Sequence, residues 1–194
     1  YNNADEVELF INGKSQGVRK KTDNRPALQP EHKNTDIFKG SGNFDGSILN
    51  TPYHVGWRVK YEPGEVKVVA KKDGKVVRET VEKTAGTAHH IRLTPDKKEM
   101  KADGTSMVFV TVEVVDNDGT LCPLAEDQIF FEVEGGAKIA GVDNGSQSSL
   151  ERFKDNKRKA LFGRCLVVLQ SDGTGKPVTL TAKSAMLKEA TVKL

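Results

Sequence analysis

Short runs of alternating apolar and polar residues recur along most of the chain. The run 7–11 has apolar residues at every second position and charged, aromatic or amide neighbours between them, which is the period-2 pattern of a half-buried strand. Asn12-Gly13 follows directly and predicts a tight hairpin, because both residues tolerate positive φ. Asp73-Gly74 predicts a second hairpin between the runs 66–70 and 76–81. The pattern therefore predicts antiparallel strand pairs.

The second half of the chain repeats this pattern over longer runs. Valines occupy every second position of 108–114, and apolar residues alternate with polar or aromatic ones in 129–133, 178–182 and 190–194. The stretch 139–170 predicts a short strand, a sharp Asp-Asn-Gly turn, a long charged loop and a final apolar strand. No segment shows a helical period of useful length. Short strands separated by turn signals at about ten-residue intervals indicate an all-β sandwich.

Two interruptions organise the chain. Residues 20–56 lack periodicity and read as a long irregular insertion, in which short strands around 36–38 and 47–49 are expected; the alternation resumes in a predicted strand at 57–61. Small residues without periodicity at 83–88 predict a domain boundary. We therefore expect an all-β fold of two tandem immunoglobulin-like β-sandwich domains, 1–85 and 86–194, because 194 residues suit two sandwiches of about 100 residues each.

Charge and hydropathy exclude several classes of protein. The formal net charge is +3, and the stretch 150–159 alone contributes five cations and two anions. Only Phe153 is interleaved with these cations, so a solvated loop is favoured over nucleic-acid binding. No apolar run approaches the roughly 18 residues that a membrane helix needs. The start at Tyr1, without methionine, suggests an excised fragment or a processed product.

The sequence shows no catalytic, cofactor-binding or metal-binding constellation. Glu62 and Glu65 flank a turn and are expected to be solvated rather than a glycosidase pair. The stretch 116–119 hints at a calcium loop, but its glycine stands at the fourth place rather than the sixth, so a turn is favoured. His89 and His90 are adjacent, and strand alternation would point their side chains to opposite faces. We expect no cofactor and no metal site.

A few residues remain as candidates for contact with a sugar or with another domain. Trp57 is the only tryptophan; its alternation with Val59 and Tyr61 favours a core position, and the alternative is a platform on which a sugar ring stacks. Phe153 is expected to anchor the charged loop. Cys122 and Cys165, the only cysteines, lie in or beside apolar strands, and the sequence leaves their pairing open. The contact candidates are Trp57, Arg152, Phe153, Lys157 and Arg158.

Several strings resemble the C-terminal immunoglobulin-like domains of bacterial glycoside hydrolase family 2 β-galactosidases. Residues 3–17, NADEVELFINGKSQG, are similar to the string that opens the first immunoglobulin-like domain after the catalytic barrel in that family. Further similarities, the later ones to an invasin-like last sandwich, lie at 61–70, 72–75, 109–116, 141–145 and 151–163. The resemblance covers nearly the whole chain except 22–56.

The resemblance implies a non-catalytic accessory segment. The catalytic glutamates of the family lie in the barrel, so no catalytic residue carries over to this chain. The implied partner is the catalytic barrel of the same parent chain, at the substrate cleft or an oligomer interface, and the implied location is the periplasm or the outside of a glycan-degrading bacterium. Two alternatives stay open: a carbohydrate-binding module with its own sugar site, and an adhesin-like spacer at the cell surface.

Overall fold

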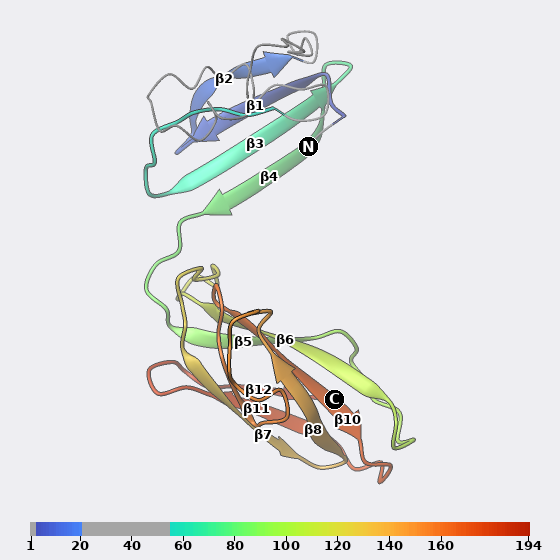
Figure 1. Ribbon diagram of the computed structural model, residues 1–194. Coiled ribbons are helices and arrows are strands. Elements are labelled where there is room, and N and C mark those ends of the chain that lie inside the picture. Colours follow the sequence, from blue (N-terminus) through green and yellow to red (C-terminus); the bar gives the residue numbers. More distant parts are fainter. Residues whose placement is uncertain (1–2, 21–54) are drawn as a thin grey trace, which may run out of the picture. The chain divides into compact units, whose positions relative to one another are not determined.

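The computed structural model describes residues 3–20 and 55–194, and these form two compact units, Tyr1–Thr84 and Ala85–Leu194 (Figure 1). All regular elements of the described residues are β-strands, which confirms the predicted all-β class. The strands expected around 36–38 and 47–49, and most of the predicted insertion, lie outside the described residues. Among the described residues, no helix of the length and apolarity needed to cross a membrane is found.

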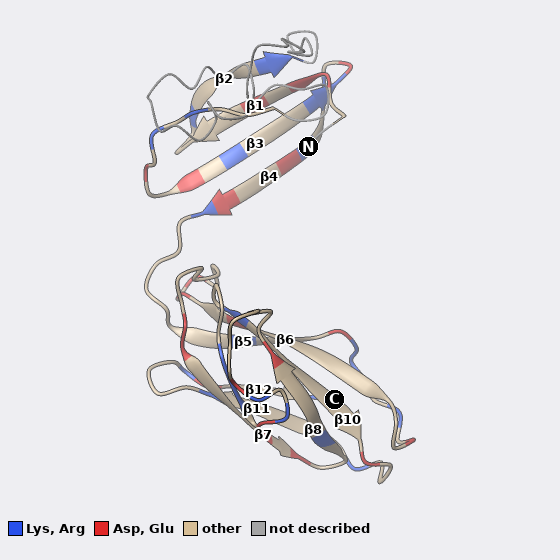
Figure 2. Cartoon of the chain, viewed as in Figure 1, with Lys and Arg blue, Asp and Glu red and all other residues tan. Residues whose placement is uncertain are grey.

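The described strands of the first unit form one antiparallel sheet, in the order β2-β1-β3-β4. Both predicted hairpins are confirmed: Asn12 and Gly13 have φ of 49° and 78°, and Asp73 and Gly74 have φ of 50° and 72°. Positive φ at both central residues defines the turn whose twist matches that of the flanking strands. Along β3 and β4, acidic and basic positions are interspersed (Figure 2). The strands are β1 (Glu6–Ile11), β2 (Lys14–Lys20), β3 (Glu65–Lys72) and β4 (Lys75–Lys83).

One face of this sheet is apolar over its two central strands. In the antiparallel register, Val7 of β1 lies opposite Ala70 of β3, and Leu9 lies opposite Val68. Opposed residues of an antiparallel pair share a face of the sheet, so these four side chains form a continuous apolar floor. The floor continues into polar residues on β4, because Val68 pairs with Thr80 and Ala70 with Arg78.

The predicted strand at 57–61 is wrong. These residues form no strand in the structure, and Val59 and Tyr61 are exposed, Tyr61 to 73%. Alternation of apolar side chains is a necessary feature of a half-buried strand, but a strand also needs a neighbour that pairs with its backbone. Trp57 is the member of this run whose side chain is half-buried.

The second unit is a sandwich of two antiparallel four-stranded sheets, β5-β6-β10-β8 and β12-β11-β7-β9 (Figure 1). The first order is that of strands A, B, E and D of an immunoglobulin constant-type domain, and β7, β11 and β12 stand in the place of C, F and G. The strands are β5 (His90–Pro95), β6 (Met107–Val115), β7 (Gln128–Glu134), β8 (Ala137–Asp143), β9 (Lys157–Lys159), β10 (Arg164–Ser171), β11 (Thr179–Lys183) and β12 (Ala190–Lys193).

The core of the second unit is made by the predicted apolar positions. The four alternating valines of β6 are fully buried, as are Ile129 of β7, Val167 and Leu169 of β10, and Leu180 of β11. These side chains come from both sheets and form one cluster between them. Period-2 alternation places them on the inner faces, where each buried aliphatic side chain contributes about 1.5–3 kcal/mol.

Candidate functional site

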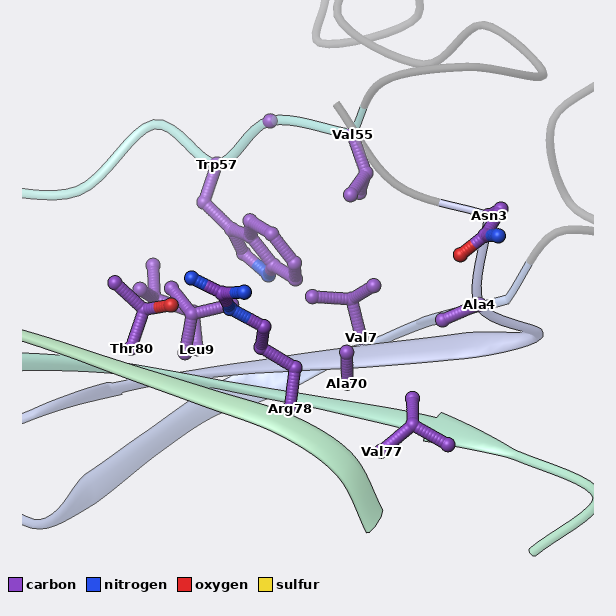
Figure 3. Close-up of a pocket in the computed structure, with 12 residues that line it drawn as sticks. Asn3, Ala4, Val7, Leu9, Val55, Trp57, Ala70, Val77, Arg78 and Thr80 are labelled. Atoms are coloured by element: carbon purple, nitrogen blue, oxygen red, sulfur yellow. The ribbon is translucent and has the colours of Figure 1, made fainter. Parts of the chain in front are cut away.

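A pocket of about 530 Å³ lies over the apolar face of the first unit's sheet. Val7 and Leu9 of β1 and Val68 and Ala70 of β3 contribute its apolar lining. The segment at Trp57 crosses above these strands, and the indole points down toward them (Figure 3). The volume falls within the range of roughly 300–1,000 Å³ that is typical of small-molecule sites.

Four polar side chains join this apolar lining: Asn3, Trp57, Arg78 and Thr80. The indole Nε1 of Trp57 is buried and has no hydrogen-bond partner among the described residues. The Arg78 side chain reaches from the exposed edge strand β4 into the same space (Figure 3), and it makes no ion pair with any described residue. A mostly apolar concavity with a few converging polar groups is the usual form of a ligand site.

The second candidate region is the loop that joins β8 to β9, and Arg158 of β9 is its centre. Arg158 is 0% exposed, although the sequence favoured a solvated loop here. Its Nη2 donates to Asn144 Oδ1 at 2.8 Å, and its Nη1 donates to the Glu151 carbonyl at 3.2 Å. The Asp143 and Glu151 carboxylates lie 3.4 and 3.6 Å from the guanidinium. Arg158 therefore lies inside the domain, where its positive charge balances the Asp143 and Glu151 carboxylates.

The other loop candidates lie at the surface. Arg152, Phe153 and Lys157 are exposed, and the Phe153 ring, 61% exposed, stands 5.3 Å from the Arg158 guanidinium carbon. The Phe153 carbonyl accepts the Val142 amide of β8 at 2.7 Å, so the loop is attached to the sandwich at this point through its backbone. Trp57 belongs to the other unit. Of the five contact candidates, Trp57 therefore lines the pocket of the first unit, and the other four lie in the charged loop of the second unit or at its end.

The carboxyl groups of the second unit whose pKa departs from the usual value are all shifted downward. Hydrogen bonds from Ser106 and Thr105 hold the pKa of Asp103 far below 3.8. The Gly86 amide, followed by the amides of Thr120 and Asp118, lowers the pKa of Asp116. These three amides occupy the Asp116 carboxylate, which gives it a role in the turn. The same downward shift applies to Glu113, Glu126 and Asp172.

His89 and His90 lie closer together than strand alternation predicts. Their Nδ1 atoms are 3.1 Å apart and the rings meet edge to face. The alternation argument fails because β5 begins at His90, so His89 lies outside the strand. Among the residues that the structure describes, no group of three or more His, Cys, Asp or Glu side chains could hold a metal ion.

Cys122 and Cys165 are both free and buried. Burial raises the pKa of the Cys165 thiol to about 12, against a smaller lowering effect of Arg158. Burial, and then the negative charge of Asp116, raises the pKa of Cys122. Thiols with raised pKa values are weak nucleophiles, so both cysteines are inert packing residues.

Two protein-family models match this chain, one in each of its two units. Residues 1–78 match a domain of unknown function (DUF4982), and residues 91–193 match the family described as glycoside hydrolase family 2 C-terminal domain 5. The second match covers more than half of the chain, and the chain belongs to this family. The resemblance found in the sequence is thereby confirmed, and the chain corresponds to the non-catalytic C-terminal region of such enzymes.

Relatives extend the similarity over the whole chain. The beta-galactosidase BoGH2A of Bacteroides ovatus is 49% identical over 194 residues, which are 100% of this chain and 20% of that protein. A beta-galactosidase of Thermoanaerobacter pseudethanolicus is 27% identical over 97% of this chain and 22% of its own length. A solved family 2 glycosyl hydrolase from Bacteroides cellulosilyticus has a TM-score of 0.79 and 30% identity, covering 99% of this chain and 23% of that one. The chain spans about a fifth of these relatives.

Proposed function

We propose that this chain is an accessory segment of a larger glycoside hydrolase family 2 β-galactosidase, in which its two domains support the catalytic barrel. The observation that carries the proposal is the 49% identity to the Bacteroides ovatus beta-galactosidase over the full length of the chain. Because the identity extends over both domains, it supports the view that the two domains occur together in one parent enzyme, next to its catalytic barrel.

The electrostatics of the second unit support a structural role for its shifted carboxyls. A glycosidase needs a carboxylic acid whose pKa is raised so that it is protonated near neutral pH. The shifted carboxyls here have lowered pKa values, and hydrogen bonds or arginine partners hold them ionised. Glu113, for example, accepts from both Arg92 and Arg164 on the outside of the sandwich. These groups stabilise turns and strand pairs.

An apolar strip on the second unit is suited to contact the rest of the parent protein. Met107 and Phe109 of β6 are exposed to 40% and 44%, and Phe109 lies opposite Val168 of β10. Phe109 alternates with buried valines, so it points away from the core. Exposed apolar side chains gathered on one face mark interaction surfaces. The exposed loop residues Arg152 and Phe153 are the other contacts that we propose.

We further propose that the parent enzyme works in the periplasm or outside the cell. This location is supported by the resemblance to enzymes of glycan-degrading bacteria. Fractionation of the native host, followed by immunodetection of the parent with antibodies against this chain, tests it. Recovery with cytoplasmic markers would overturn the location and leave the accessory role intact.

The accessory role is tested by removing this segment from the parent. The parent lacking both domains should retain its catalytic residues but unfold at a lower temperature, and the isolated chain should release no nitrophenol from a chromogenic galactoside. As a control for contamination, any turnover in the chain preparation is compared with that of the Glu62→Gln and Glu65→Gln variants. Turnover that follows the chain through purification and falls in either variant would refute the proposal.

A further inference from the structure

The pocket of the first unit combines an apolar floor with one buried polar group, the Trp57 indole N–H, that has no hydrogen-bond partner among the described residues. The floor is aliphatic, and the indole of Trp57 forms a flat aromatic wall above it (Figure 3). The buried Trp57 Nε1 is a donor only, and leaving such a group without an acceptor costs free energy. A ligand that places an oxygen against this nitrogen would remove that cost.

The charge at the pocket is positive. Arg78 is the charged residue in its lining, and its planar guanidinium offers paired N–H donors that match the geometry of a carboxylate. Asn3 and Thr80 add amide and hydroxyl groups, which both donate and accept. The preferred ligand is therefore rich in oxygen, carries a carboxylate, and has a face of C–H bonds that can pack on indole.

From these features we propose that the pocket binds an acidic sugar, a uronate residue of an oligosaccharide. The apolar face of the pyranose packs on the Trp57 indole, whose π face attracts the slightly positive C–H bonds. The carboxylate pairs with Arg78, and an exocyclic oxygen of the sugar that extends past the edge of the indole, in the plane of its rings, accepts from Trp57 Nε1. A neutral sugar would fill the same space without the charge-assisted contact. This site is independent of the accessory role proposed above.

The sole tryptophan makes the test direct. The whole chain is titrated with trigalacturonate and, separately, with a neutral galactotriose, while the emission of Trp57 is recorded. Trigalacturonate should change the emission saturably, and galactotriose should bind about tenfold more weakly because it lacks the charged partner of Arg78. In a ¹⁵N-resolved NMR spectrum, the single indole N–H signal should move with trigalacturonate, as expected if its nitrogen gains an acceptor.

Two variants separate a specific contact from general attraction of anions. Arg78→Gln removes the guanidinium from an exposed strand position and should reduce trigalacturonate affinity about tenfold, to that of the neutral ligand. Lys75→Gln removes the same charge from an exposed position of the same strand outside the pocket lining and should leave affinity unchanged. Equal weakening in both variants, or an emission and an indole signal that ignore trigalacturonate in the folded chain, would overturn the proposal.

Discussion

Arg158 Nη2 donates to Asn144 Oδ1 at 2.8 Å, and this contact joins β9 to the turn that ends β8. A second bond joins the same two segments in the opposite direction, since Asn144 Nδ2 donates to the Lys159 carbonyl at 2.8 Å. Glu151 closes the arrangement: its carboxylate accepts from the Lys159 amide and lies 3.6 Å from Arg158 Nε. The charged loop is therefore folded around one buried cation, and its surface residues are presented by that internal network.

Replacement of Arg158 by methionine should destabilise the second domain by about 2–3 kcal/mol. This loss is below the roughly 3–5 kcal/mol of a fully buried broken ion pair, because the Asp143 and Glu151 carboxylates keep partial contact with water. Urea unfolding measures the change. Lys157→Met, at an exposed position of the same strand, is the matched control and should stay within about 0.5 kcal/mol. Equal loss in both variants would contradict the buried network.

Alanine at Gly135 should destabilise the domain by more than about 4 kcal/mol or prevent folding. Gly135 has φ of +93°, and a Cβ there would collide with the Pro177 carbonyl oxygen. Gly145 has φ of +74°, and no atom lies within 4 Å of the place that a Cβ would take, so Gly145→Ala should cost only about 1–2 kcal/mol of backbone strain. Thermal unfolding compares the two variants, and similar losses would show that the Pro177 contact is absent.

The second domain should lose stability in acid partly through Asp103 and Asp116. Hydrogen bonds lower both pKa values below the usual 3.8, so the ionised carboxylates stabilise the fold above about pH 4 and this contribution falls away as the pH drops through the folded-state pKa values. Asp103→Asn and Asp116→Asn should reduce stability at neutral pH and flatten the acid limb of the stability–pH curve. Asp118→Asn, at an exposed neighbouring position, is the control and should change stability at neutral pH by no more than about 0.5 kcal/mol.

Both cysteines should resist alkylation in the folded protein and react at once in denaturant. At pH 8 the Cys165 thiol, with its pKa raised to about 12, is almost entirely protonated, and the Cys122 pKa is also raised. Intact mass after iodoacetamide treatment should show no adduct under native conditions and two in guanidinium chloride. A mass that stays unmodified in denaturant until a reductant is added would reveal a disulfide instead.

Both hairpins and most strands of the described residues could be predicted from the sequence because their signals are local; the exceptions are the predicted strand at 57–61, which is absent, and β9, which lies in the predicted loop. The buried valines of β6 follow from alternation alone, and the Asn12-Gly13 and Asp73-Gly74 turns follow from the φ values that these residues tolerate. The family resemblance rested on such strings as well. Each signal spans a few consecutive residues, so no knowledge of distant contacts was required.

The surroundings of the candidate site residues depend on tertiary contacts that the sequence pattern does not reveal. In the sequence, Arg158 looks like one more cation of a solvated loop. In the structure, β9 pairs with β7, and Arg158 is buried against Asn144 and Glu151. Trp57 continues an apparent strand pattern, yet the absence of strand pairing at 57–61 leaves its indole over the floor of β1 and β3, facing Arg78 from a different strand. Alternation reports which face of a strand a side chain occupies. Which strand pairs with which, and what then lies across that face, is set by contacts between residues far apart in sequence.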